Sequence, residues 1–305
     1  MIDAAIAAAL ARVPELAGVP ADSWRIETLP SLSNRVYRLS GAAGDYVLRF
    51  ANEAPYLDRM REAHNHRLAA ANGLAPPVFF DDPESGTLVT AFEPGTATFD
   101  RSGGGGRAIE AVAYGLRRLH GSKLAFKGEM RLAPTMEEYL AIAGRAGSGA
   151  AALWSRWRPM LVPVLPLIES ELVPSHVDPV PRNILVAGTG DAARVRFVDW
   201  EYSAPAAPIW DLADFAIEAE LGDDDEKRLL SAYGIEPRTA VDAAFRLYKP
   251  LLDLLAAAWA ASQIALHGSR AEHDAMIGAR LARARAACER PGFETLIPAA
   301  ARLDY

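Results

Sequence analysis

Alternating apolar and polar residues near the start of the chain predict a β-hairpin. RVYRLSGAAGDYVLRFA, residues 35–51, contains two alternating runs joined by Gly-Ala-Ala-Gly, which is a turn sequence. On the second run Tyr46, Leu48 and Phe50 share one face, so Arg49 lies on the opposite face. The hairpin therefore separates an apolar side from a side that carries a cation.

A helix and a second hairpin are predicted to follow. Residues 54–77 favour a helix that ends at Asn72-Gly73, with Glu62 near its middle. PVFFDDPESGTLVTAF, residues 77–92, predicts two more strands around the turn DDPESG. The first twenty residues favour a surface helix.

The rest of the chain is mostly helical in pattern. Helical periodicity extends from residue 107 to about 172 and again beyond Trp210, and NILVAGTGDAARVRFVDW, residues 183–200, predicts a hairpin between the two stretches. The glycine tract 102–107 predicts a flexible solvent loop rather than a phosphate cradle, because no strand precedes it and no lysine follows it.

These patterns predict an α+β fold with two lobes. A small antiparallel-sheet lobe with one main helix, residues 1–94, would precede a larger and mostly helical lobe, residues 95–305. At 305 residues the chain is long enough for two cores of ordinary size.

Composition and charge narrow the function classes. Half of the residues are hydrophobic, and the net charge of -7 disfavours a nucleic-acid partner while attracting a cationic small molecule. The single cysteine, Cys288, excludes an internal disulfide and suits a reducing compartment, and no apolar run is long enough for membrane insertion. We expect a cytoplasmic protein; the sequence does not specify its oligomeric state.

The segment HVDPVPRNIL, residues 176–185, carries the candidate chemistry. Its two prolines force extended backbone before them and hold Asp178 on a rigid loop. In the predicted hairpin Val195, Phe197 and Asp199 share one strand face, which would place Asp199 at the strand end, close to Asn183.

Two carboxylates and an amide oxygen are the groups that phosphoryl transfer from a nucleotide requires, one as a base and two as hard ligands for Mg²⁺. The alternative is a solvated turn and strand end. For His176 we expect a hydrogen bond to backbone that fixes the loop, rather than proton transfer.

The spacing His176-x-Asp178-x₄-Asn183, followed by Asp199 in VDWEYS, resembles a known motif. It is similar to the catalytic loop and metal site of the choline/ethanolamine kinase and aminoglycoside phosphotransferase superfamily, distant relatives of protein kinases. The resemblance spans about residues 24 to 220 and implies a two-lobed protein kinase-like fold. By this resemblance Asp178 is the catalytic base, and Asn183 and Asp199 bind Mg²⁺.

The resemblance also implies an ATP site in the small lobe. LSNRVYRL resembles the nucleotide-covering loop and contains Ser33 and Asn34, while DYVLRF resembles the strand whose basic residue, here Arg49 rather than Lys, binds the phosphates. An arginine suits this role because its planar fork can bind phosphate and pair with Glu62. Adenine is expected at the hinge around Phe92. The alternatives are a surface-strand Arg49 and an ordinary helix-surface Glu62.

The acceptor is expected to be a cation, because aromatic faces and carboxylates follow the metal motif. The candidate contacts are Trp200, Glu201, Tyr202, Asp211 and Trp259. DWEYS resembles the choline kinase branch, so we expect ATP-dependent phosphorylation of choline or ethanolamine. The alternatives are an aminoglycoside or thiamine phosphotransferase and, in a different class, a non-catalytic nucleotide-binding pseudokinase.

Three further features bear on the acceptor. GDDDEKR, residues 222–228, could meet an aminoglycoside, but it fits a helix start better because carboxylates favour that end of the dipole. Many relatives have Asn at the position of Val177, and many have Asn-Asp-Pro where this chain has Ala-Ala-Pro at 206–208. These departures concern the contacts with the acceptor.

Overall fold

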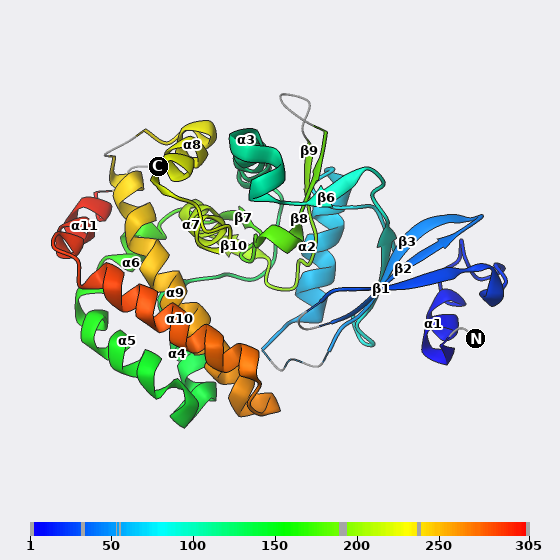
Figure 1. Ribbon diagram of the computed structural model, residues 1–305, viewed down its shortest axis with the longest axis horizontal. Coiled ribbons are helices and arrows are strands. Elements are labelled where there is room, and N and C mark those ends of the chain that lie inside the picture. Colours follow the sequence, from blue (N-terminus) through cyan, green and yellow to red (C-terminus); the bar gives the residue numbers. More distant parts are fainter. Residues whose placement is uncertain are drawn as a thin grey trace.

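The computed structural model describes residues 3–31, 34–52, 54, 56–188, 194–236 and 239–302. A β-sheet lies at one end of the molecule and a group of helices at the other (Figure 1). The sheet is antiparallel with strand order β1-β2-β3-β5-β4. Its strands are β1 (Arg25–Leu29), β2 (Arg35–Gly41), β3 (Gly44–Phe50), β4 (Val78–Asp82) and β5 (Thr87–Ala91).

Both hairpins predicted in this part of the sequence are confirmed. Gly41 pairs with Gly44, so β2 and β3 are joined by the two residues between them. Tyr46 and Leu48 face a small apolar core, which is covered by the N-terminal helix α1 (Ala4–Leu10). Arg49 lies on the opposite face, as the alternation predicted, and that face lines a cavity.

The predicted first-lobe helix is α2 (Arg59–Ala71). It begins because the Asp58 carboxylate accepts the N–H of Arg61 at 3.0 Å, and it ends at Asn72, as the sequence indicated. Glu62 lies in its first turn and is buried. The helix packs against β4 and carries Glu62 toward Arg49.

The larger part of the chain is helical, with two small sheets embedded in it. Strand β6 (Thr96–Thr98) pairs with β8 (Ile184–Ala187), which pairs with β9 (Arg194–Phe197), and β7 (Val173–Ser175) pairs with β10 (Ala204–Ala206). The α-helices are α3 (Arg101–His120), α4 (Leu132–Ala143), α5 (Ser148–Leu161), α6 (Leu165–Ile168), α7 (Pro208–Glu218), α8 (Asp223–Tyr233), α9 (Ala240–His267), α10 (Ala271–Cys288) and α11 (Phe293–Ala300), and the short 3₁₀ turns are Ala21–Ser23, Gly144–Gly147 and Pro181–Asn183.

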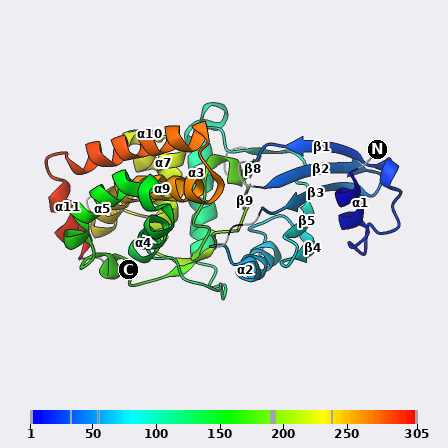
Figure 2. The same ribbon diagram turned by 90° about the horizontal axis from the view of Figure 1, so that it is seen from below.

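Helix α9 is the central element of this part. It packs against α4, α5, α7, α10 and α11 and contributes many residues to the large apolar core (Figure 2). The helical periodicity beyond Trp210 is therefore confirmed. None of the helices among the described residues has both the length and the apolarity that crossing a bilayer requires.

Two local predictions are wrong. The tract 102–107 is not a solvent loop but the first part of α3, whose backbone departs from helical angles at Gly105, with φ +53°. The helix starts at Arg101, which donates to the Glu220 carbonyl at 2.7 Å, and it continues into an apolar face that anchors it. Strand β9 ends at Phe197, and Asp199 has φ +65°, so Asp199 does not share the buried face of Val195 and Phe197.

Candidate active site

A cavity of about 1300 Å³ lies between the sheet and the helical part. The free face of the large sheet forms one wall with Val47 and Arg49, and residues from α7, α9 and α10 form the opposite wall. The loop that carries Asp178 and Asn183 borders the cavity between them, together with Asp199. The structure therefore brings the predicted base, amide and second carboxylate to one space.

The loop from His176 to Asn183 is held by hydrogen bonds at both ends. The Asn183 side-chain amide donates to the Asp178 carboxylate at 2.8 Å and to the Asp178 carbonyl at 3.1 Å. His176 is fully buried, and its Nε2 donates to the Val198 carbonyl at 3.0 Å, which confirms the predicted structural role. The loop is thus tied directly to the segment that carries Asp199.

Asp211 supports this loop from beneath. Its buried carboxylate accepts the backbone N–H groups of His176 at 2.8 Å and Val177 at 2.7 Å, and it also accepts His120 Nε2–H at 3.1 Å. All three of these partners are protein groups, and the Asp211 side chain is fully buried and does not line the cavity. The structure therefore gives Asp211 a positioning role in place of the predicted acceptor contact.

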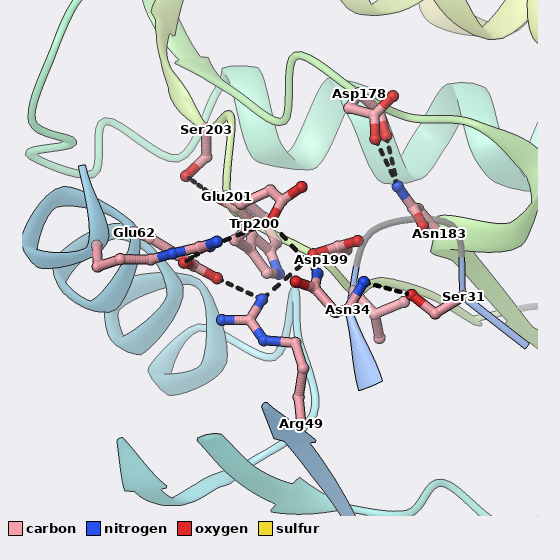
Figure 3. Close-up of polar contacts among 12 residues, drawn as sticks. Ser31, Asn34, Arg49, Glu62, Asp178, Asn183, Asp199, Trp200, Glu201 and Ser203 are labelled. Atoms are coloured by element: carbon pink, nitrogen blue, oxygen red, sulfur yellow. Dashed lines mark hydrogen bonds and ion pairs between the residues drawn. The ribbon is translucent and has the colours of Figure 1, made fainter. Parts of the chain in front are cut away.

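Three charged residues form an ion-pair network at the cavity. The Nη1 atom of Arg49 lies 2.5 Å from Glu62 Oε1 and 3.2 Å from Asp199 Oδ1 (Figure 3). Arg49 and Glu62 are both buried, so neither is the surface residue of the alternative interpretation. Burial alone would raise the pKa of Glu62, but Arg49 and Arg59 outweigh it and hold the pKa below its ordinary value.

A second arginine extends this network and was missed from the sequence. Arg59 Nη1 lies 2.8 Å from Glu62 and 3.1 Å from Glu201, so it joins α2 to the segment after Asp199. Asn34 completes the chain, because its amide nitrogen is 3.3 Å from Glu201 and its amide oxygen accepts the Asn52 N–H at 3.2 Å. Arg59 lies one helical turn before Glu62, a spacing that could have indicated the shared face.

The cavity concentrates carboxylates of raised pKa. Burial is the largest cause for Asp178 and Asp199, and for Glu201 burial and then the neighbouring Asp199 raise the pKa to about 7. Burial, followed by repulsion from Glu218 and Asp178, also raises the pKa of Asp214 well above its ordinary value. Each shift reflects negative charge held in a poorly solvated space, which favours the binding of cations.

The donor set fits Mg²⁺ bound together with a nucleotide. The nitrogen of the Asn183 amide is occupied by Asp178, which leaves the amide oxygen as a ligand beside the Asp199 carboxylate. No group of three or more His, Cys, Asp or Glu side chains suited to a metal exists among the described residues. Mg²⁺ at nucleotide sites uses one or two protein ligands and completes its shell with phosphates and water, so this small set is appropriate.

Aromatic rings line the cavity at the end formed by α4 and α9. Tyr56 and Tyr139 meet edge to face with centroids 5.9 Å apart, and Trp259 Nε1 donates to the Tyr202 hydroxyl at 3.0 Å. Trp259 thus reaches the cavity from late in the chain, and Glu201 and Tyr202 line it as well. Trp200 does not, because its fully buried indole packs in the core and donates to the Phe197 carbonyl.

The predicted nucleotide contacts are only partly placed. Phe92 lines the cavity, and the Arg38 guanidinium lies 3.9 Å from the centre of its ring. The N–H groups of Ala91 and Phe92 are donated to the carbonyls of Pro77 and Asp45, so an adenine at this hinge would meet other backbone atoms. Ser33 lies outside the described residues.

Comparisons with known proteins show the class to which this protein belongs. The model of the phosphotransferase enzyme family matches residues 25–251. A solved choline/ethanolamine kinase family protein from Mesorhizobium loti is 30% identical, with a TM-score of 0.81 over 97% of this chain and 98% of that one. The structure is therefore a two-lobed protein kinase-like fold, and the protein is a small-molecule kinase.

Two more relatives agree with this class. The curated protein LicA of Haemophilus influenzae is 25% identical over 66% of this chain and 76% of its own length. The solved choline kinase LicA from Streptococcus pneumoniae shares the fold, with 20% identity and a TM-score of 0.67 over 86% of this chain and 92% of that one. The chain belongs to the phosphotransferase enzyme family and, within it, to the choline/ethanolamine kinase family.

Proposed function

We propose that the protein transfers the γ-phosphoryl group of ATP, with Mg²⁺, to the hydroxyl of a small cationic amino alcohol such as choline or ethanolamine. One observation carries the proposal: Asp178, Asn183 and Asp199 meet in a single cavity that also has aromatic and acidic walls. The names of the relatives support the acceptor class. The reducing, ATP-containing cytoplasm suits this activity.

Each residue of the site has a defined task in this proposal. The Asp178 carboxylate accepts the proton of the acceptor hydroxyl, and Asn183 fixes the carboxylate's orientation through its 2.8 Å hydrogen bond. Asn183 and Asp199 hold Mg²⁺, which neutralises charge on the phosphates when it is bound. Arg49 presents its guanidinium to the phosphates while Glu62 holds it in place.

The walls of the cavity favour a compact cation as acceptor. Tyr139, Tyr202 and Trp259 offer aromatic faces, and each such face attracts a cation by about 0.5 to 2 kcal/mol. The acidic tract of α8 lies in its exposed first turn, as predicted for a helix start, and does not line the cavity. The tract therefore offers no support to an aminoglycoside as acceptor.

The test is ADP release from Mg-ATP with choline, ethanolamine, thiamine, an aminoglycoside and no acceptor, for the wild type and Asp178→Ala. We expect a signal with an amino alcohol that is lost in Asp178→Ala while calorimetry still detects nucleotide binding. Asp223→Ala, at an exposed position of α8, is the matched control and should keep the signal.

Each other result contradicts a part of the proposal. A signal with thiamine or an aminoglycoside alone would support phosphoryl transfer from ATP but contradict an amino alcohol as the acceptor. ATP binding without transfer to any acceptor would overturn catalysis and favour the non-catalytic alternative.

A further inference from the structure

Asp214 is a cavity carboxylate that the proposed mechanism leaves without a task. It lies on α7 between Trp210 and Glu218, at intervals of four residues, and all three side chains line the cavity. Trp210 Nε1 donates to the Val177 carbonyl at 3.1 Å, so this stripe begins directly against the catalytic loop. Asp214 is one helical turn further along the same face.

The other carboxylates around the cavity that are not fully exposed have protein partners. Asp178 is bound by Asn183, Asp199 by Arg49, Glu201 by Arg59 and Glu93 by Arg196. Glu218, on the same stripe as Asp214, is bound by Arg280 of α10. In each case a side chain of the protein donates to the carboxylate or pairs with it.

No hydrogen bond or ion-pair contact reaches the Asp214 carboxylate from the residues that the structure describes. The attractive charge that acts on it most strongly is Arg280, which is already paired with Glu218 and with Asp253 at 3.0 Å. Its carboxylate is part-buried, and burial together with repulsion from Glu218 raises its pKa. The Asp214 carboxylate lines the cavity without a protein donor among the described residues, so a donor on a ligand bound in the cavity can reach it.

We infer that Asp214 determines acceptor specificity by accepting a hydrogen bond from an N–H of the acceptor's ammonium group. The inference rests on the proposed function and narrows its substrate class to amino alcohols with at least one N–H. A trimethylated ammonium has the same charge but no donor, and it would leave the Asp214 carboxylate unsatisfied behind a shell of methyl groups. Aromatic walls alone would serve both kinds of cation.

A methylation series separates the hydrogen bond from the charge. The acceptors are 2-aminoethanol and its N-methyl, N,N-dimethyl and N,N,N-trimethyl derivatives, which carry three, two, one and no N–H groups at constant charge. For the wild type we expect kcat/KM to fall by about 10- to 100-fold at the last methylation, the step that removes the final donor. In Asp214→Leu, whose side chain has a similar size and no hydrogen-bond acceptor, this step should shrink to about threefold or less.

Two controls distinguish specificity from damage to the fold. The KM for ATP should be unchanged in Asp214→Leu, and Tm should equal or exceed the wild-type value, because the substitution removes an uncompensated charge. Asp223→Leu, at an exposed position on α8, should retain the wild-type profile. Should Asp214→Leu fold poorly, Asp214→Ala offers the same comparison without a side-chain acceptor.

The outcomes separate this inference from the function on which it rests. Equal kcat/KM values across the series, a wild-type preference for the trimethylated alcohol, or a preference that persists in both Asp214 variants would overturn the role of Asp214 alone. No transfer by the wild type to any of the four alcohols would overturn the proposed function and this inference together.

Discussion

The Asp211 carboxylate holds Val177 in a left-handed backbone conformation. Its Oδ1 accepts the Val177 N–H at 2.7 Å, and Val177 has φ +73°, a region that β-branched residues seldom occupy. The conformation places Asp178 at the cavity while His176 is directed into the core. The chain therefore uses a buried charge to hold a strained residue beside its candidate base.

Val177→Asn should be tolerated far better than an ordinary buried Val→Asn substitution. Relief of the left-handed strain, about 1 to 3 kcal/mol, opposes the loss of apolar burial, so we expect a free energy of unfolding within about 1 kcal/mol of wild type. Denaturant unfolding measures it. Val180→Asn, in the same loop with φ -69° and also buried, should cost about 2 to 3 kcal/mol. Equal costs at the two positions would show that Val177 is not strained.

Asp211→Ala should lower both stability and turnover. It would leave the N–H groups of His176 and Val177 and the His120 ring without their acceptor, at a cost of about 3 kcal/mol in the free energy of unfolding. Because Asp211 does not line the cavity, kcat should fall more than the acceptor KM rises. A change confined to the KM for the acceptor would indicate that Asp211 contacts the acceptor, as the sequence predicted.

Asp199→Asn should weaken the affinity for Mg-ATP. The substitution removes the negative charge from the proposed ligand pair, because the Asn183 amide is neutral, while Arg49 remains paired with Glu62, so the fold should persist. Titration of activity with Mg²⁺ should show a requirement at least tenfold higher, and calorimetry without Mg²⁺ should show little change in ATP affinity. An unchanged Mg²⁺ requirement would place the metal elsewhere.

Arg49→Ala should raise the KM for ATP by about tenfold or more and the KM for the acceptor much less. The guanidinium lies between Glu62 and Asp199 at the wall that the large sheet forms. Arg25→Ala, at an exposed position on β1, is the control for loss of a strand arginine and should leave both constants unchanged. An effect on the acceptor alone would remove Arg49 from the phosphate site.

Stability should fall as pH decreases below about 6.5, partly because of His66. Burial is the main cause that lowers the pKa of this fully buried histidine from 6.5 in the unfolded chain to about 3 in the folded one. Between these pKa values only the unfolded state takes up the proton, so each unit by which the pH falls lowers the free energy of unfolding by up to about 1.4 kcal/mol. Above pH 7 His66 is neutral in both states and adds no pH dependence.

His66→Leu should make the unfolding free energy depend less on pH between about pH 6.5 and 4.5. The slope should fall by up to about 1.4 kcal/mol per pH unit, which corresponds to one proton. His64→Leu, at a half-buried position on the same helix, is the control for loss of a histidine. An unchanged slope in His66→Leu would mean that His66 is already charged in the folded protein.

Local patterns predicted much of the fold, because strand alternation and helix stop signals act over a few residues. They placed Arg49 opposite Leu48, and the spacing of Asp178, Asn183 and Asp199 identified the candidate catalytic loop. The glycine tract was misjudged because its helix is anchored by Arg101, which bonds Glu220 far along the chain.

Side-chain direction in the acceptor half was less predictable. The sequence predicts that Trp200 contacts the cation, but the turn around Asp199, with its positive φ, directs the indole into the core. Asp214 was missed although its spacing of four residues from Trp210 was visible, because only the tertiary structure shows which face of α7 meets the cavity. Arg59 pairs with Glu201, 142 residues away, and no local signal marks such a partner.

Helix α9 limits how the proposed acceptor end of the cavity can change in evolution. The helix lines the cavity with Leu252, Leu255 and Trp259 while its other faces fill the core against α4, α7, α10 and α11. A substitution on α9 that reshapes the cavity therefore also disturbs packing on which folding depends. Adaptation to a new acceptor would be easier at Asp214 on α7, because a substitution of this part-buried residue leaves no cavity in the core.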